Sequence, residues 1–61
     1  MQTADLLVNM IPLKQLAERM LPRNSTLRML ILSEPDYLPR TEALVKIVVY
    51  ARLLYRELWE D

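Results

Sequence analysis

The residue types that most often perform chemistry are nearly missing from this sequence. It has no Cys and no His, so it lacks a thiol nucleophile, an imidazole base and the usual zinc or iron ligands. Its serines, Ser25 and Ser33, stand where a helix cap or a turn explains them. There is no glycine to build a phosphate-binding loop. We therefore expect no catalytic residues, no cofactor, no metal and no small-molecule substrate: the protein is not an enzyme.

Three carboxylates gather near the C-terminal end of the sequence, at Glu57, Glu60 and Asp61. Paired carboxylates can act as a general acid and base, but only where burial or a neighbouring charge separates their pKa values. A cluster on a solvated helix end normally serves solubility instead. We interpret these three residues in that way.

Size and composition point to association with another chain. A chain of 61 residues buries only about 60% of its unfolded surface on folding, so its stability is marginal. Disulfides and structural metals, which stabilise many small domains, need residues that this chain lacks. Eight basic and eight acidic side chains cancel, so no overall charge attracts nucleic acid or an anionic membrane.

Prolines divide the chain into apolar blocks, and each block follows the helical period. The first block begins with Thr3 as N-cap and Asp5 in the first turn, and its apolar stripe continues past Pro12 to Met20. Two interpretations of Pro12 stay open: it kinks one long helix, or it starts the second of two short helices.

Two further helices are expected after Pro22. The apolar segment "TLRMLILS" has no second strand to pair with, so we expect a buried helix capped by Asn24 or Ser25 and ending near Ser33. A long final helix should start near Pro39 or Thr41. The expected fold is therefore all-α, a three- or four-helix bundle in a single helical domain spanning residues 1–61.

The final helix carries more apolar surface than one side can bury. At ~100° per residue, one group forms an arc of roughly 160° that we expect to face the core. This arc consists of Ala43, Leu44, Ile47, Val48, Ala51, Leu54, Tyr55, Leu58 and Trp59. A second stripe, formed by Val45, Val49 and Leu53, lies among charged residues on the other side.

The second stripe predicts self-association. If two copies cross antiparallel at Val49, Val45 faces Leu53 of the other copy. Glu42 then faces Arg56, an attractive charge pair, whereas Lys46 faces Arg52, which is not attractive. The expected homodimer interface comprises Glu42, Val45, Val49, Arg52, Leu53 and Arg56. Two alternatives are that the stripe is ordinary core, or that it docks a different protein.

Residues 13–32 resemble the helix-turn-helix motif of DNA-binding proteins. The apolar positions that carry the resemblance are Leu16, Ala17, Met20, Leu27 and Leu30. It implies a first helix over residues 13–20, a recognition helix over residues 24–32 and DNA contacts from a basic segment. Those contacts are Lys14, Arg19, Arg23, Asn24, Ser25 and Arg28. The motif's turn glycine is replaced by Leu21, and Pro22 follows it; alternatively, the apolar residues are simply core.

A membrane role is not expected, because Lys46 and Arg52 interrupt the most apolar segment. The N-terminal residues lack the pattern of a secretory signal, so we expect a cytoplasmic protein. The favoured function is a small non-catalytic intracellular interaction module that works as a homodimer, with regulation as one option. The alternative is a dimeric helix-turn-helix DNA-binding protein.

Overall fold

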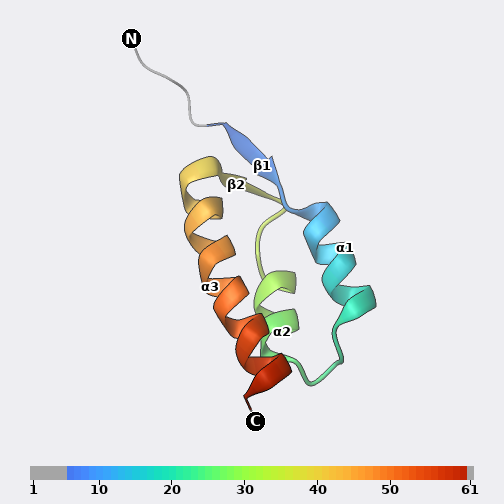
Figure 1. The fold of residues 1–61 in the computed structure, drawn as a ribbon. Coiled ribbons are helices and arrows are strands. Elements are labelled where there is room, and N and C mark those ends of the chain that lie inside the picture. Colours follow the sequence, from blue (N-terminus) through green and yellow to red (C-terminus); the bar gives the residue numbers. More distant parts are fainter. Residues whose placement is uncertain (1–5, 61) are drawn as a thin grey trace.

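The computed structural model describes residues 6–60, which form helices and two short strands (Figure 1). Their order is β1 (Leu7–Asn9), α1 (Ile11–Met20), α2 (Thr26–Leu32), β2 (Tyr37–Pro39) and α3 (Arg40–Trp59). In Figure 1, α2 lies between α1 and α3, and the two strands lie at the end of the molecule where α1 and α3 begin.

The expectation of an all-α bundle is wrong, because β1 and β2 form an antiparallel two-stranded sheet. In its register, Val8 pairs with Leu38, the central residues of the two strands. The backbone amide of Met10 extends the pairing by donating to the carbonyl of Asp36 at 2.6 Å. Each strand has three residues, which is too few to show the alternation of apolar and polar residues that identifies a strand in a sequence. Helical periodicity was the visible pattern, and it led to the prediction of helices alone.

Helix α1 begins at Ile11, with Pro12 in its first turn. Pro12 therefore starts a helix and does not kink one, since a proline there removes no intrahelical hydrogen bond. The side chain of Asn9 accepts a hydrogen bond from the Ile11 amide at 3.0 Å. The expected cap at Thr3 and the acid at Asp5 lie outside the described residues.

Helix α2 confirms the helix expected in the "TLRMLILS" segment. Ser25 is its N-cap, and the hydroxyl accepts a hydrogen bond from the Arg28 amide at 3.0 Å. At the other end, the Ser33 amide donates to the Met29 carbonyl at 3.1 Å. Both serines thus act in helix ends, as their positions predicted.

A carboxylate from the last turns of α3 completes the cap of α2. Glu57 accepts a hydrogen bond from the Ser25 hydroxyl at 2.6 Å and another from the Leu27 amide at 2.9 Å. These two bonds, the Ser25 one above all, lower the pKa of Glu57 from its ordinary value of 4.5. A negative charge also suits the N-terminal end of a helix. Glu57 is therefore a structural residue and not part of a solubilising tail.

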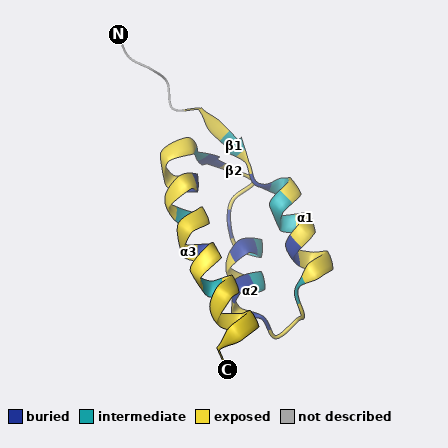
Figure 2. Ribbon diagram, in the orientation of Figure 1, coloured by how far each residue is buried: buried dark blue, intermediate teal, exposed yellow. Residues whose placement is uncertain are grey.

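The core consists of two small clusters. Tyr50 of α3 packs with Ala17, Leu27 and Ile31, while Ala43 at the start of α3 packs with residues of the sheet end, Met10 and Leu38. Most of the remaining surface of α3 is exposed, as the yellow ribbon in Figure 2 shows. Of the broad apolar arc only Ala43 is buried and the other eight residues are exposed, so the expectation that this arc faces the core is wrong.

The Glu57 contact predicts a specific pH dependence of folding. Because the pKa of Glu57 is lower in the folded state, its contribution is complete above the unfolded value and disappears as the pH falls through the folded value. We expect Glu57→Gln to lower the urea midpoint near pH 7, with the difference from the wild type vanishing at the acidic end. Urea unfolding from pH 7 to pH 2, followed by circular dichroism, measures this.

Glu60→Gln is the matched control, because Glu60 forms only an exposed ion pair with Arg56 at 3.8 Å. The control should unfold like the wild type throughout. An equal loss in both variants, or a Glu57→Gln difference that persists in acid, would contradict the capping role.

Candidate functional site

The most prominent surface of the molecule is an exposed apolar side of α3, which we call the α3 face. It consists of Leu44, Ile47, Val48, Ala51, Leu54, Tyr55, Leu58 and Trp59. Its large side chains are between 38% and 69% exposed. The inward side of α3 is instead narrow: Ala43 and Tyr50 enter the core, and Glu57 reaches the start of α2. No charged residue interrupts the α3 face.

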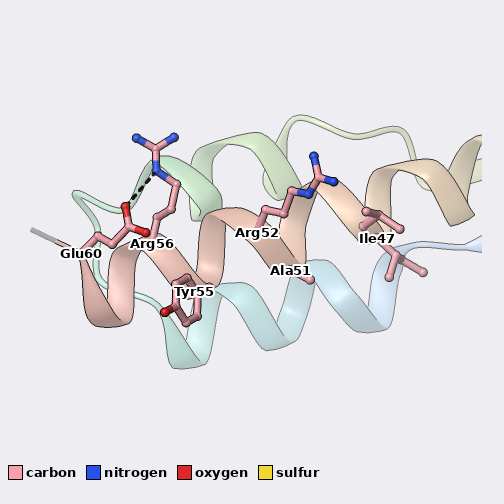
Figure 3. A pocket seen from close by; sticks show the side chains of 7 residues that line it. Ile47, Ala51, Arg52, Tyr55, Arg56 and Glu60 are labelled. Atoms are coloured by element: carbon pink, nitrogen blue, oxygen red, sulfur yellow. Dashed lines mark ion pairs between the residues drawn. The ribbon is translucent and has the colours of Figure 1, made fainter.

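A hollow at Ala51, whose side chain is short, extends from the middle of the α3 face to its charged edge. It is lined by Ile47, Val48, Ala51 and Tyr55 on the apolar side and by Arg52, Arg56 and Glu60 at the edge. Figure 3 shows Arg52 pointing to the opposite side from Tyr55. Tyr55 also stacks on Trp59, with ring centroids 5.3 Å apart, so both aromatic side chains present a fixed apolar surface to solvent.

A groove of about 390 Å³ adjoins the α3 face. Its walls come from α1 and α3 and its floor from α2, and it is lined by Leu13, Leu16, Ala17, Met20, Leu21, Leu27, Ile31, Leu54 and Leu58. Leu54 and Leu58 belong to both surfaces, so the groove and the α3 face are continuous. On α1, Leu16 and Met20 are 54% and 72% exposed.

The three apolar residues of the stripe that the sequence assigned to self-association differ in burial. Val45 and Val49 are exposed, but Leu53 packs against the core cluster of Tyr50. The predicted charges are also engaged within the chain: Glu42 lies 3.6 Å from Lys46, and Arg56 pairs with Glu60. Arg52 is exposed. This side of α3 thus offers less apolar surface than the α3 face.

Two of the residues assigned to DNA binding are engaged within the chain. Ser25 is buried in the α2 cap, and Lys14 binds the Glu34 carbonyl at 2.8 Å and Asp36 at 3.1 Å. Arg19, Arg23 and Asn24 are exposed, and Arg28 is half-buried. A recognition helix contacts bases from its N-terminal end, and here that end holds the Glu57 carboxylate. DNA binding stays an untested prediction.

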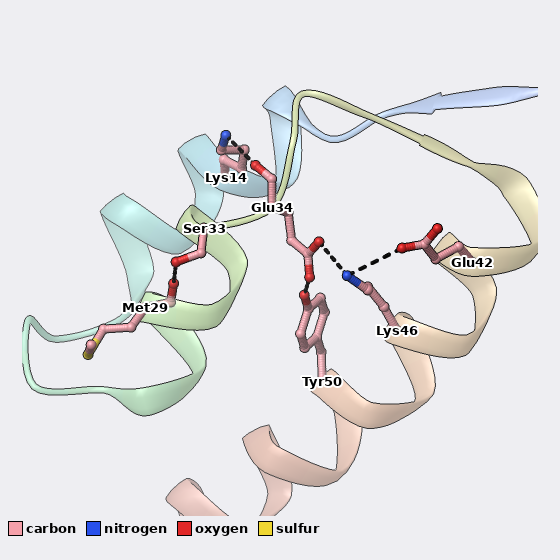
Figure 4. A network of polar contacts seen from close by, with 7 residues as sticks. All are labelled: Lys14, Met29, Ser33, Glu34, Glu42, Lys46 and Tyr50. Atoms are coloured by element: carbon pink, nitrogen blue, oxygen red, sulfur yellow. Dashed lines mark hydrogen bonds and ion pairs between the residues drawn. The ribbon is translucent and has the colours of Figure 1, made fainter.

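Glu34 is the centre of the main polar network (Figure 4). Its carboxylate is 8% exposed, accepts a hydrogen bond from the Tyr50 hydroxyl and pairs with Lys46 at 2.7 Å. The hydrogen bond with Glu34 is the main cause of a raised pKa for Lys46. Lys14 binds the backbone of the same residue. Every ionised group here has a partner, so the network joins α1 and α3 to the connection between α2 and β2.

Other kinds of site find little support in residues 6–60. No group of three or more acidic side chains comes together there as a metal ion would require. No helix in the same part of the chain combines the length and apolar character needed to cross a membrane. The α3 face and its groove are therefore the candidate functional site, and its recognition chemistry is apolar contact.

The Glu34 network predicts unequal effects for two acids that contact the same lysine. Glu34→Ala leaves the buried Tyr50 hydroxyl without a partner, and we expect it to lower the free energy of unfolding by about 1–3 kcal/mol. Glu42→Ala removes only an exposed contact and should cost no more than about 1 kcal/mol. Urea unfolding at pH 7 compares them, and equal losses would show that Glu34 is not the structural centre.

The next prediction concerns DNA binding. We expect the double variant with Arg23→Ala and Arg28→Ala to have the same affinity for duplex DNA as the wild type. The reason is the carboxylate at the start of α2, which repels phosphate. Fluorescence anisotropy with a labelled duplex at low and high salt provides the measurement. Salt-sensitive binding that the double change abolishes would support the helix-turn-helix interpretation instead.

In comparisons with known proteins, no protein-family model, no curated protein and no solved structure matches this chain.

Proposed function

We propose that this protein is a small non-catalytic interaction module of the cytoplasm that works as a homodimer through the α3 face. One observation carries the proposal: the largest apolar side of its longest helix is exposed, while a narrow side with Tyr50 and Ala43 faces the core. Exposed continuous apolar surfaces of this kind commonly mark binding sites. A regulatory role fits a dimer that acts only through its surfaces.

The size of the α3 face supports a stable interface. Burying a large apolar side chain removes roughly 60–120 Å² of apolar area from water. The eight residues of the α3 face are about half exposed, so together they offer on the order of 400 Å² of apolar area to a partner. One partner in a standard interface contributes about 800 Å², of which roughly 60% is apolar. The α3 face thus supplies most of the apolar area that one partner needs, and Leu16 and Met20 beside the groove add to it.

The character of the α3 face favours a second copy as the partner. None of the residues that form it is charged, and Arg52, Arg56 and Glu60 stand only at its edge, so its main contact surface is apolar. A matching partner must itself expose a long apolar surface. The same chain presents such a surface, and homodimers join identical patches about a two-fold axis. Dimer formation also stabilises a chain whose own core is small.

The proposal predicts that a charge in the centre of the α3 face disrupts the dimer. We expect the wild type to have about twice the 7.2 kDa mass of the chain, and a melting temperature that rises with protein concentration. Ala51→Glu should yield a monomer, because two buried like charges would meet in the interface. Light scattering over a wide concentration range measures the mass of both.

Val49→Glu is the matched control, since Val49 lies on the other side of the same helix and is 44% exposed. It should remain a dimer. If Val49→Glu is monomeric and Ala51→Glu is dimeric, the interface is the stripe of Val45 and Val49. A wild-type monomer at every concentration would overturn the homodimer.

A further inference from the structure

We infer that the two copies pack their α3 helices antiparallel, with the two-fold axis at Ala51. This arrangement rests on the proposed homodimer and specifies it. It gives the residues of the α3 face from Leu44 to Leu58 a partner in the other copy, and it places the N-terminal half of one α3 over the groove of the other.

The order of side chains along the α3 face is symmetrical about Ala51. Three residues from Ala51 in either direction stand Leu54 and Val48, four residues away stand Tyr55 and Ile47, and seven residues away stand Leu58 and Leu44. In an antiparallel pair centred on Ala51, each of these residues lies opposite its counterpart in the other copy. Every such pair is apolar, so the face complements itself as an isologous interface requires.

The hollow at Ala51 allows the close approach that this packing needs. Helix axes in contact are separated by about 8–10 Å, depending on the side chains at the crossing. Two alanines at the axis permit the short end of that range. Ile47 and Tyr55, which border the hollow, then interdigitate with Tyr55 and Ile47 of the other copy.

The same arrangement covers the groove. The C-terminal half of the α3 face adjoins the groove through Leu54 and Leu58. Opposite those two residues, the antiparallel register places Val48 and Leu44 of the second copy. The side chains of Val48 and Leu44 can enter the groove beside Met20, a residue that is 72% exposed in the single chain.

The charges at the edge of the α3 face can be accommodated in the antiparallel pair. Arg52 and Arg56 of the two copies lie along the same edge, but the two Arg56 residues are separated by about 15 Å along the axis, at 1.5 Å per residue. The two Arg52 residues lie near each other, and their long side chains extend into solvent.

Single cysteines test the arrangement cleanly, because the chain has none of its own. Oxidised Ala51→Cys should form a disulfide-linked dimer in high yield, since the two Cα atoms at the axis lie close together. Leu44→Cys alone should stay uncrosslinked, as the two copies of residue 44 would be about 21 Å apart. A mixture of the Leu44→Cys variant and a mass-tagged Leu58→Cys variant should be crosslinked by a short bifunctional maleimide into a dimer of one chain of each kind, because residue 44 lies opposite residue 58.

Val49→Cys is the control for random collision and should remain uncrosslinked. Self-crosslinking of both Leu44→Cys and Leu58→Cys would show a parallel pair and overturn the inference. Crosslinking of Val49→Cys in place of Ala51→Cys would move the contact to the stripe of Val45 and Val49. A wild-type dimer in which no variant crosslinks also overturns the arrangement but keeps the dimer, whereas a wild-type monomer by light scattering overturns the proposed function itself.

Discussion

The contact between the Tyr50 hydroxyl and the Glu34 carboxylate decides which side of α3, the longest helix, faces the core. Tyr50 reaches this buried acid only if its side of α3 faces the core, and Lys46, one turn earlier, then pairs with the same carboxylate. A buried carboxylate without partners is costly, so the preference for this orientation is strong. The consequence is that the broad apolar arc of α3 faces solvent. The exposed α3 face is thus a result of satisfying one polar group.

A second polar contact holds the other end of the same helix. Glu57 joins the last turns of α3 to the first turn of α2 through Ser25 and Leu27, while Ala43 anchors the start of α3 beside the sheet. Helix α3 is therefore attached at its start, middle and end. This attachment presents the α3 face as a preformed surface, so a partner pays little to order it on binding.

The sequence predicted the helices well where signals were local. The start of α2 was placed at Asn24 or Ser25, and Ser25 is the cap; at Pro12 a kink and a helix start were both open, and the structure has the helix start. The strands were missed because β1 and β2 pair residues far apart in the chain, and neither is long enough to show a pattern. The orientation of α3 was missed for a related reason. Apolar residues outnumber polar ones on the broad arc, and the sequence does not reveal that Tyr50, Lys46 and Glu57 find partners inside.

By itself, the sequence determined that the chain is mainly helical, that cysteine and histidine chemistry is absent, and that there is more apolar surface than one small domain can bury. Composition, capping residues and periodicity carry this information, because each acts within a few residues along the chain. Tertiary structure alone decided which side of α3 stays exposed and where the groove lies. That choice depends on a carboxylate at Glu34 and its partners on two other elements, and contacts between distant segments leave no periodic trace in the sequence.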